Sequence, residues 1–136
     1  GVLSQVLEHL AKEKVNIVAL TMMDSVEHGV MRVVVTAPKK AREILDRLNM
    51  PYSESEVLCL NLDNKAGALA DVVDKLARSH INISYAYCTA GQKGGKTTGV
   101  LKVADVKKAM KTLKSGGKKA SKKEKTIRRS KASRGR

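Results

Sequence analysis

The sequence predicts an α+β protein made of two tandem ferredoxin-like βαββαβ units, the first lacking its N-terminal strand, followed by a disordered basic tail. Three observations lead to this prediction. A segment near the start of the chain recurs 66 residues later, helical and strand-like hydrophobic spacings alternate along each copy, and the end of the chain is rich in Ser, Gly, Lys and Arg. The expected domains are residues 1–55, residues 56–114 and the tail, residues 115–136.

The composition limits the kind of core that the chain can form. It contains no Trp, no Phe and only three Tyr among 136 residues, so the core must be aliphatic. An aliphatic core suits sheets covered by amphipathic helices. No run of about eighteen apolar residues and no signal-peptide pattern is present, which predicts a cytoplasmic protein without a membrane span.

The internal repeat is the strongest signal. A shift of 66 residues aligns residues 1–17 with residues 67–83, and seven of the seventeen positions are identical. The identical pairs are Gly1/Gly67, Leu3/Leu69, Val6/Val72, Leu10/Leu76, Ala11/Ala77, Asn16/Asn82 and Ile17/Ile83. Further on a shift of 68 aligns residues 39–41 with residues 107–109, and the two extra residues fall in a Gly-rich turn of the second copy. Such a period predicts two copies of one structural unit.

Each copy has the same expected order of elements. Apolar residues at helical spacing are followed by a strand, a turn, a second strand and a second helix. In chain order the expected elements are helices near residues 3–11 and 69–77, strands at 15–23 and 81–89, strands at 30–36 and 97–103, and helices at 38–48 and 105–113. Residues 52–62 are expected to be extended and to join the copies. Because residue 1 already stands at a helix start, we expect a further strand ahead of it.

The segment that joins the first strand and first helix of the second copy is a candidate binding loop. Gly67 permits a tight turn and a close approach of the backbone to a ligand. The first turn of the following helix offers unpaired N–H groups and the positive end of the helix dipole, which together can hold a small carboxylate. The alternative is an ordinary strand-to-helix turn in which Asn64 or Asp63 caps the helix.

Asn16 and Asn82 form a second repeated signal, because each follows a helix and precedes an Ile that starts a strand. An Asn at this place can end a helix in the left-handed conformation. Its side-chain amide can instead pair with a ligand or with the neighbouring copy. The sequence leaves both interpretations open.

A family resemblance rests on these motifs. The run Asn64-Lys65-Ala66-Gly67-Ala68-Leu69, followed by Leu76-Ala77 and Ile81-Asn82-Ile83, resembles the signature of ACT domains. The shorter run Gly1-Val2-Leu3, Leu10-Ala11 and Val15-Asn16-Ile17 is similar to a second, truncated copy, and the resemblance covers residues 1 to about 114. It is greatest to small stand-alone tandem ACT proteins, some of which are described as acetolactate-synthase regulatory-like.

The resemblance implies a non-catalytic regulatory module that binds a small amino acid between two ACT units, with allosteric regulation and a dimer formed through the sheets. It also implies a set of ligand-binding residues. They are Asn64, Lys65, Ala66, Gly67, Ala68, Leu69 and Asn82 in the second copy, and Gly1, Val2, Leu3 and Asn16 in the first.

No set of residues typical of an enzyme is found. The three histidines do not cluster in the sequence, and neither a phosphate-binding Gly loop, a nucleophile elbow nor paired carboxylates stand out. Cys59 and Cys88 lie in apolar runs without the spacing of a metal or redox site, which predicts two buried thiols. The sequence therefore predicts no catalysis, no metal and no cofactor.

The tail carries most of the positive charge. Residues 115–136 hold ten of the 27 basic residues and one of the 13 acidic residues, so they contribute +9 to a net charge of +14. With one aliphatic residue, Ile127, the tail is expected to be disordered. It is either a solubilising extension or a nonspecific contact for polyanions. An alternative function is nucleic-acid binding by the tail and a ferredoxin-like sheet, with Tyr85 and Tyr87 as the candidate stacking residues.

Overall fold

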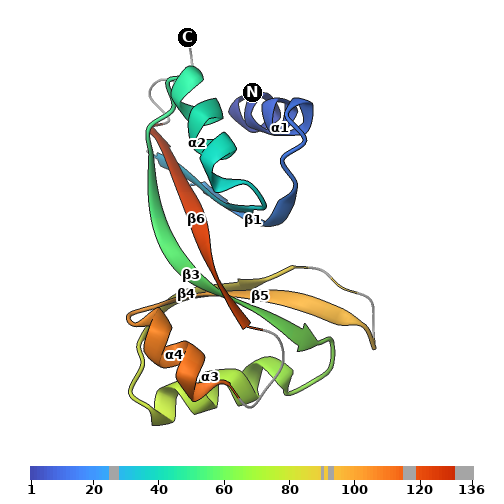
Figure 1. Cartoon of the computed structure of the whole chain (residues 1–136), viewed down its shortest axis with the longest axis vertical. Helices are drawn as coiled ribbons and strands as arrows, with labels where there is room; N and C mark the ends of the chain where they lie inside the picture. Colours follow the sequence, from blue (N-terminus) through green and yellow to red (C-terminus); the bar gives the residue numbers. More distant parts are fainter. Residues whose placement is uncertain (25–27, 90, 92–93, 115–118, 131–136) are drawn as a thin grey trace. The chain divides into compact units, whose positions relative to one another are not determined.

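A computed structural model of the chain describes residues 1–24, 28–89, 91, 94–114 and 119–130 (Figure 1). In chain order the elements are α1 (Val2–Lys12), β1 (Ile17–Asp24), β2 (His28–Val35), α2 (Pro38–Arg47), β3 (Tyr52–Asp63), α3 (Ala68–Arg78), β4 (Ile83–Cys88), β5 (Lys96–Val103), α4 (Val106–Thr112) and β6 (Lys119–Ser130). The chain forms two compact units. Unit one contains Gly1–Ser55 and Lys123–Arg136, and unit two contains Glu56–Lys122.

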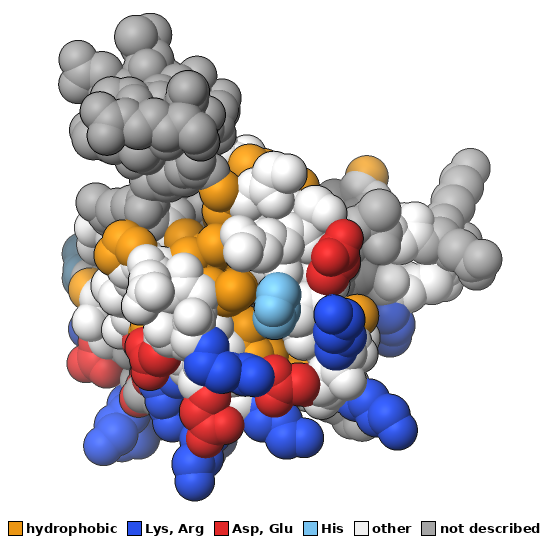
Figure 2. All heavy atoms as spheres, turned by 90° about the horizontal axis from the view of Figure 1, so that it is seen from above, with side chains coloured by type: hydrophobic (Ala, Val, Ile, Leu, Met, Phe, Trp, Pro, Cys, Tyr) orange, Lys and Arg blue, Asp and Glu red, His pale blue; other side chains and the backbone are white. Residues whose placement is uncertain are grey.

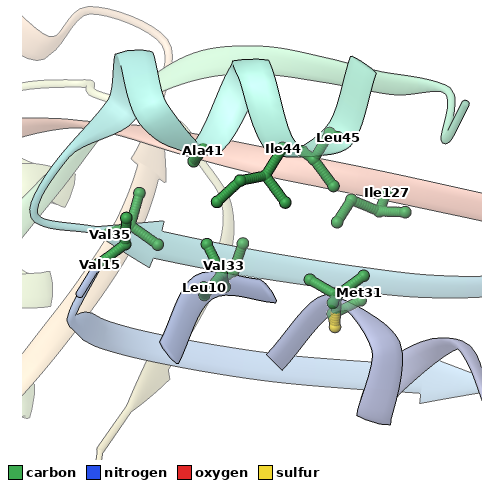
Figure 3. Close-up of a cluster of buried hydrophobic side chains, with 10 residues drawn as sticks. Leu10, Val15, Met31, Val33, Val35, Ala41, Ile44, Leu45 and Ile127 are labelled. Atoms are coloured by element: carbon green, nitrogen blue, oxygen red, sulfur yellow. The ribbon is translucent and has the colours of Figure 1, made fainter. Parts of the chain in front are cut away.

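Unit one is an antiparallel sheet covered by α1 and α2. Its strand order is β1-β2-β6, so β2 is paired on both edges. Alternate residues of β2 face the helices because side chains alternate along a strand. The buried cluster of this unit contains Val6, Leu10, Val15, Met31, Val33, Val35, Ala41, Ile44, Leu45 and Ile127, most of which Figure 3 labels. Two amphipathic helices thus share one aliphatic sheet face, as the periodicity predicts.

Unit two repeats this arrangement with the strand order β3-β5-β4 and the helices α3 and α4. Its core contains Leu58, Leu60, Leu62, Leu76, Ile81, Leu101, Val103, Ala109 and Leu113. Asp105 caps α4, since its carboxylate accepts a hydrogen bond from the Lys108 N–H at 3.0 Å. The α+β class and the two ferredoxin-like units are confirmed.

Small irregularities recur in both units and show how closely the copies correspond. The register of β1 on β2 shifts between Ile17 and Ala19, and that of β4 on β5 shifts between Ile83 and Tyr85, which is the equivalent place. After their first helices, the units turn through Lys14 and His80, whose φ angles are both 57°. These residues, and not the asparagines that follow them, adopt the left-handed conformation.

The interpretation of Asn16 and Asn82 as left-handed helix caps is therefore wrong. The backbone carbonyl of each asparagine instead accepts a hydrogen bond from the residue that follows the second strand of the hairpin in its unit. The Asn16 oxygen accepts from the Thr36 N–H at 3.0 Å, and the Asn82 oxygen accepts from the Ala104 N–H at 3.1 Å.

The expectation of a disordered tail is wrong for residues 119–130, which form β6. This strand is antiparallel to β2, with Ile127 opposite Met31 and Lys125 opposite Val33. The composition of the tail does not indicate a strand, because Ile127 is its one aliphatic residue. The strand also buries the ammonium of Lys125, which an ion pair with Glu54 neutralises. Residues 115–118 and 131–136 lie outside the described residues.

Two leucines on α3 provide a direct test of the core of unit two. Leu76 is fully buried and Leu69 is 37% exposed. Leu76→Ala should lower the free energy of unfolding by about 2–5 kcal/mol because it leaves a cavity beneath the helix. Leu69→Ala should change it by roughly 1 kcal/mol or less. Urea denaturation measures both, and equal losses would contradict this packing.

Candidate ligand-binding site

The loop between β3 and α3 turns through Gly67, which is the N-cap residue of α3 and has a φ of 89°. A left-handed backbone suits glycine because a Cβ would be strained there. A Cβ placed on Gly67 would meet no atom within 4 Å, so the requirement for glycine is conformational. No side chain caps this helix end, and the interpretation of Asn64 or Asp63 as the cap is therefore wrong.

Asn64 instead links the loop to the hairpin turn between β4 and β5 by hydrogen bonds. Its backbone N–H donates to the Gly95 oxygen at 2.9 Å, and its side-chain amide donates to the Gly91 oxygen at 3.1 Å. Gly91 itself approaches β5 closely, since a Cβ on it would lie 2.6 Å from the Lys96 oxygen. The loop and the turn are held together at one end of unit two.

A pocket of about 380 Å³ lies at this junction. It is lined by Leu62, Asp63, Asn64, Lys65, Ala68, Leu69, Cys88, Thr89, Gly91 and Thr97. Its size is within the range of small-molecule sites. The lining combines aliphatic surface, two hydroxyls, charged groups and the first turn of a helix, so it offers both apolar and polar contacts to a small ligand.

The hairpin wall of the pocket is ordered by threonine hydroxyls. The hydroxyl of Thr97 donates to the backbone oxygen of Thr89. The hydroxyl of Thr89 accepts from the Thr98 N–H at 3.1 Å.

The prediction of two buried thiols is half wrong, because Cys59 is buried and Cys88 is exposed. Cys88 contributes to the pocket lining and serves as a chemical probe of it.

The charges around the loop favour an anion at the helix end. The hydrogen bond and the charge of Lys96 lower the pKa of the Asp63 carboxyl, more than partial burial raises it, and Lys65 adds to the lowering. Asp63 is thus ionised and paired with Lys96. Lys65 and the uncapped N-terminus of α3 remain as positive electrostatic features beside the aliphatic lining.

The structure brings some of the expected site residues together and separates others. Asn64, Lys65, Ala68 and Leu69 line the pocket, and Ala66 and Gly67 complete its loop. Asn82 precedes β4, whose other end carries Cys88, so it lies roughly 20 Å from the pocket by the rise of an extended strand. Asn16 has the equivalent position in unit one.

Unit one has a counterpart of this pocket, with different chemistry. Its hollow of about 30 Å³ is lined by Val2, Leu3, Met22, Gly29, Val30, Met31 and Ile127. By the repeat, Val2 and Leu3 correspond to Ala68 and Leu69, and Met22 corresponds to Cys88. All of these residues lack polar side chains, and the volume is about that of one water molecule. Gly1 precedes Val2 as the N-cap residue of α1.

Sequence reasoning missed the hairpin side of the pocket, namely Cys88, Thr89, Gly91 and Thr97. These residues follow no motif of their own. The one usable signal was the Gly-rich turn after residue 89, because in a ferredoxin-like unit this turn lies at the same end of the sheet as the loop after the first strand.

The paired units, each with a helix that starts beside a hairpin, form a tandem repeat of one α+β unit. The family described as an ACT domain pair matches residues 1–116, and the chain belongs to this family. No curated protein matches the chain.

Solved structures that are similar to the chain include the following two. Protein BT0572 from Bacteroides thetaiotaomicron has 28% sequence identity and a TM-score of 0.79, over 89% of this chain and 83% of that one. The ligand-free regulatory subunit of aspartate kinase from Thermus thermophilus has 16% identity and a TM-score of 0.41, over 54% of this chain and 52% of that one.

Two features are absent from the described part of the chain. Within it, no group of three or more His, Cys, Asp or Glu side chains is arranged to hold a metal ion. None of its helices combines the length and the apolar character needed to span a membrane.

The Asp63–Lys96 pair gives a pH prediction. A carboxyl whose pKa is lower in the folded protein adds stability above its unfolded pKa, and this stability is lost as the pH falls through the folded pKa. Titration by NMR should give Asp63 a pKa below its ordinary value of 3.8. Lys96→Gln should return the pKa towards that value, whereas Lys102→Gln, on the same strand, should not. An unchanged Asp63 titration in Lys96→Gln would contradict the assignment.

Proposed function

We propose that the chain is a regulatory module that binds a small amino acid in the pocket of unit two. The observation that carries the proposal is the junction of an uncapped helix N-terminus, a left-handed Gly67 and an open, partly aliphatic pocket. Membership of the ACT domain pair family supports it, since ACT domains are regulatory ligand-binding modules.

In this proposal the ligand carboxylate lies at the N-terminus of α3, where backbone N–H groups, the helix dipole and Lys65 favour an anion. The ammonium group lies towards the hydroxyls of Thr89 and Thr97 and the carboxylate of Asp63. The side chain of the ligand contacts Leu62 and Leu69. The modest pocket volume and this aliphatic lining favour a short aliphatic side chain.

We further propose one ligand for each chain. The equivalent hollow of unit one has about 30 Å³ and an apolar lining, so it lacks both the room and the polar partners for a zwitterion. Unit one then serves as the partner domain of the pair.

Binding would be transmitted through the contacts that build the pocket. A ligand that touches both the loop and the hairpin favours the arrangement in which Asn64 bonds to Gly91 and Gly95. Binding to that arrangement alone shifts its population by the differential affinity of the ligand.

Dimer formation, a cytoplasmic location and a role of Asn82 and Asn16 in the site stay predictions.

The nucleic-acid alternative gains no support from the described residues. Tyr85 and Tyr87 stack with ring centroids 6.5 Å apart, but they lie on β4, at the end of the strand order of unit two and not on a central strand. On the face drawn in Figure 2, Lys and Arg side chains alternate with Asp and Glu and do not form a patch of one sign.

A thermal-shift screen of the twenty amino acids tests the proposal. One or a few should raise the Tm of the full chain, because a ligand that binds only the folded state stabilises it. Gly67→Asp should remove the shift, since it places a negative charge at the anion site. Gly67→Asn is the matched control: it has nearly the same shape, tolerates a left-handed backbone and should retain most of the shift. If no amino acid raises the Tm, or if both variants respond alike, the proposal is contradicted.

Cys88 provides an independent readout of the site. The exposed Cys88 thiol should react with a thiol reagent in the folded protein, while the buried Cys59 thiol should not. A bound amino acid should slow labelling of Cys88 in proportion to site occupancy, because Cys88 lines the pocket. Asn82→Ala should leave this protection unchanged if the site is confined to the pocket. Loss of protection in Asn82→Ala would extend the site to the Asn-Ile segment, and an amino acid that raises the Tm without protecting Cys88 would place the ligand elsewhere.

A further inference from the structure

In each unit, one strand of the hairpin, β2 or β5, pairs with a third strand. This third strand comes from a different part of the chain in each unit. In unit two, β5 pairs with β3, which directly precedes the first helix of that unit. In unit one, the equivalent edge of β2 pairs with β6, which follows all the other elements. Both strands are antiparallel to the hairpin strand that they meet, so β6 takes in unit one the position that β3 takes in unit two.

The two pairings also have the same register. By the repeat, Met31 and Val33 correspond to Gly99 and Leu101. Their partners are Ile127 and Lys125 in unit one, and Leu60 and Leu58 in unit two. Residues 124–130 of β6 therefore stand in the places of residues 57–63 of β3.

The chemistry of the two strands differs sharply at these places. Leu58, Leu60 and Leu62 all belong to the core of unit two. Of the corresponding β6 residues, Ile127 alone joins the core cluster of unit one among the described side chains, and Lys125 takes the place of Leu58. The helix-facing residues of β2 in unit one are as aliphatic as those of β5 in unit two, so β6 is the poorer match for its partner strand. A strand with leucines at alternate positions would bury more apolar surface there.

Ion pairs compensate for this mismatch. The ammonium of Lys125 is fully buried and is paired with Glu54, which also accepts from the Arg42 guanidinium at 3.0 Å. Burial tends to raise the pKa of Glu54, but the hydrogen bonds from Lys125 and Arg42 outweigh it and hold the pKa below its ordinary value. A buried charge pair of this kind offsets a desolvation cost and often stabilises less than an apolar contact of similar size.

We propose that the edge of β2 in unit one is a docking site for an extended aliphatic peptide, which binds by strand addition and displaces β6. The peptide has Val or Leu at alternate positions, in the pattern of residues 57–63, and runs antiparallel to β2. Backbone hydrogen bonds to β2 supply affinity, and the aliphatic side chains that replace Lys125 on the core face supply specificity. The docking site is in unit one and is independent of the amino-acid pocket in unit two.

The test uses the full chain and a synthetic peptide with the sequence of residues 56–63, carrying Cys59→Ser to prevent oxidation. The peptide should bind, and hydrogen exchange should then accelerate in residues 124–127 while β2 stays protected. A scrambled peptide of the same composition, without alternating leucines, should not bind. Failure of the intact peptide to bind, or binding that leaves the exchange of β6 unchanged, would overturn the proposal.

Variants of the ion pair make the test quantitative. Glu54→Gln leaves the buried Lys125 charge uncompensated, so it should weaken the docking of β6 and raise peptide affinity at least about tenfold. Glu43→Gln, which changes an exposed glutamate on α2, is the matched control and should not alter the affinity. Lys125→Leu should strengthen β6 and lower the affinity. This variant keeps the test decisive if Glu54→Gln fails to fold, and an affinity that does not fall in Lys125→Leu would contradict displacement.

Discussion

The fold depends on one interaction, the pairing of a third strand with one strand of each hairpin, β2 in unit one and β5 in unit two. A two-stranded hairpin alone is marginally stable, and a third strand gives the two helices of each unit a face wide enough to cover. In unit two the added strand is β3, which supplies Leu58 and Leu60 to the core. In unit one it is β6, which supplies Ile127. The difference between these two strands underlies most of the asymmetry between the units.

The same pairing positions the candidate site. The last pair of β3 with β5 joins Asp63 to Lys96, so the loop that follows Asp63 begins where the turn between β4 and β5 ends. Asn64 can therefore reach Gly91 and Gly95, and Gly67 can turn the chain into α3 beside the hairpin. The pocket is a consequence of where this register ends, and its polar lining comes from the two segments that meet there.

The local elements could be predicted from the sequence because their signals are local. Helical spacing and the alternation within strands concern neighbouring residues, and the 66-residue repeat shows that the same local pattern occurs twice, so the α+β units follow from them. The strand state of residues 119–130 could not be predicted, since it depends on a partner strand and on the Glu54–Lys125 pair, which are distant in sequence. Likewise the exposure of Cys88 and the tie from Asn64 to the hairpin turn depend on contacts across the sheet. The loop at residues 64–69 was predictable, whereas the hairpin wall that faces it was not.

The central claim is that an amino acid binds at the start of α3 in unit two, with one ligand for each chain. Titration of the isotope-labelled protein with the amino acid that gives the largest thermal shift measures this directly, because each backbone amide reports on its own surroundings. The account predicts that the largest chemical-shift changes occur at Lys65, Leu69 and Thr97, saturate at one equivalent and leave Val2, Leu3 and Met22 nearly unchanged. Changes centred on the hollow of unit one, or saturation at two equivalents, would contradict it.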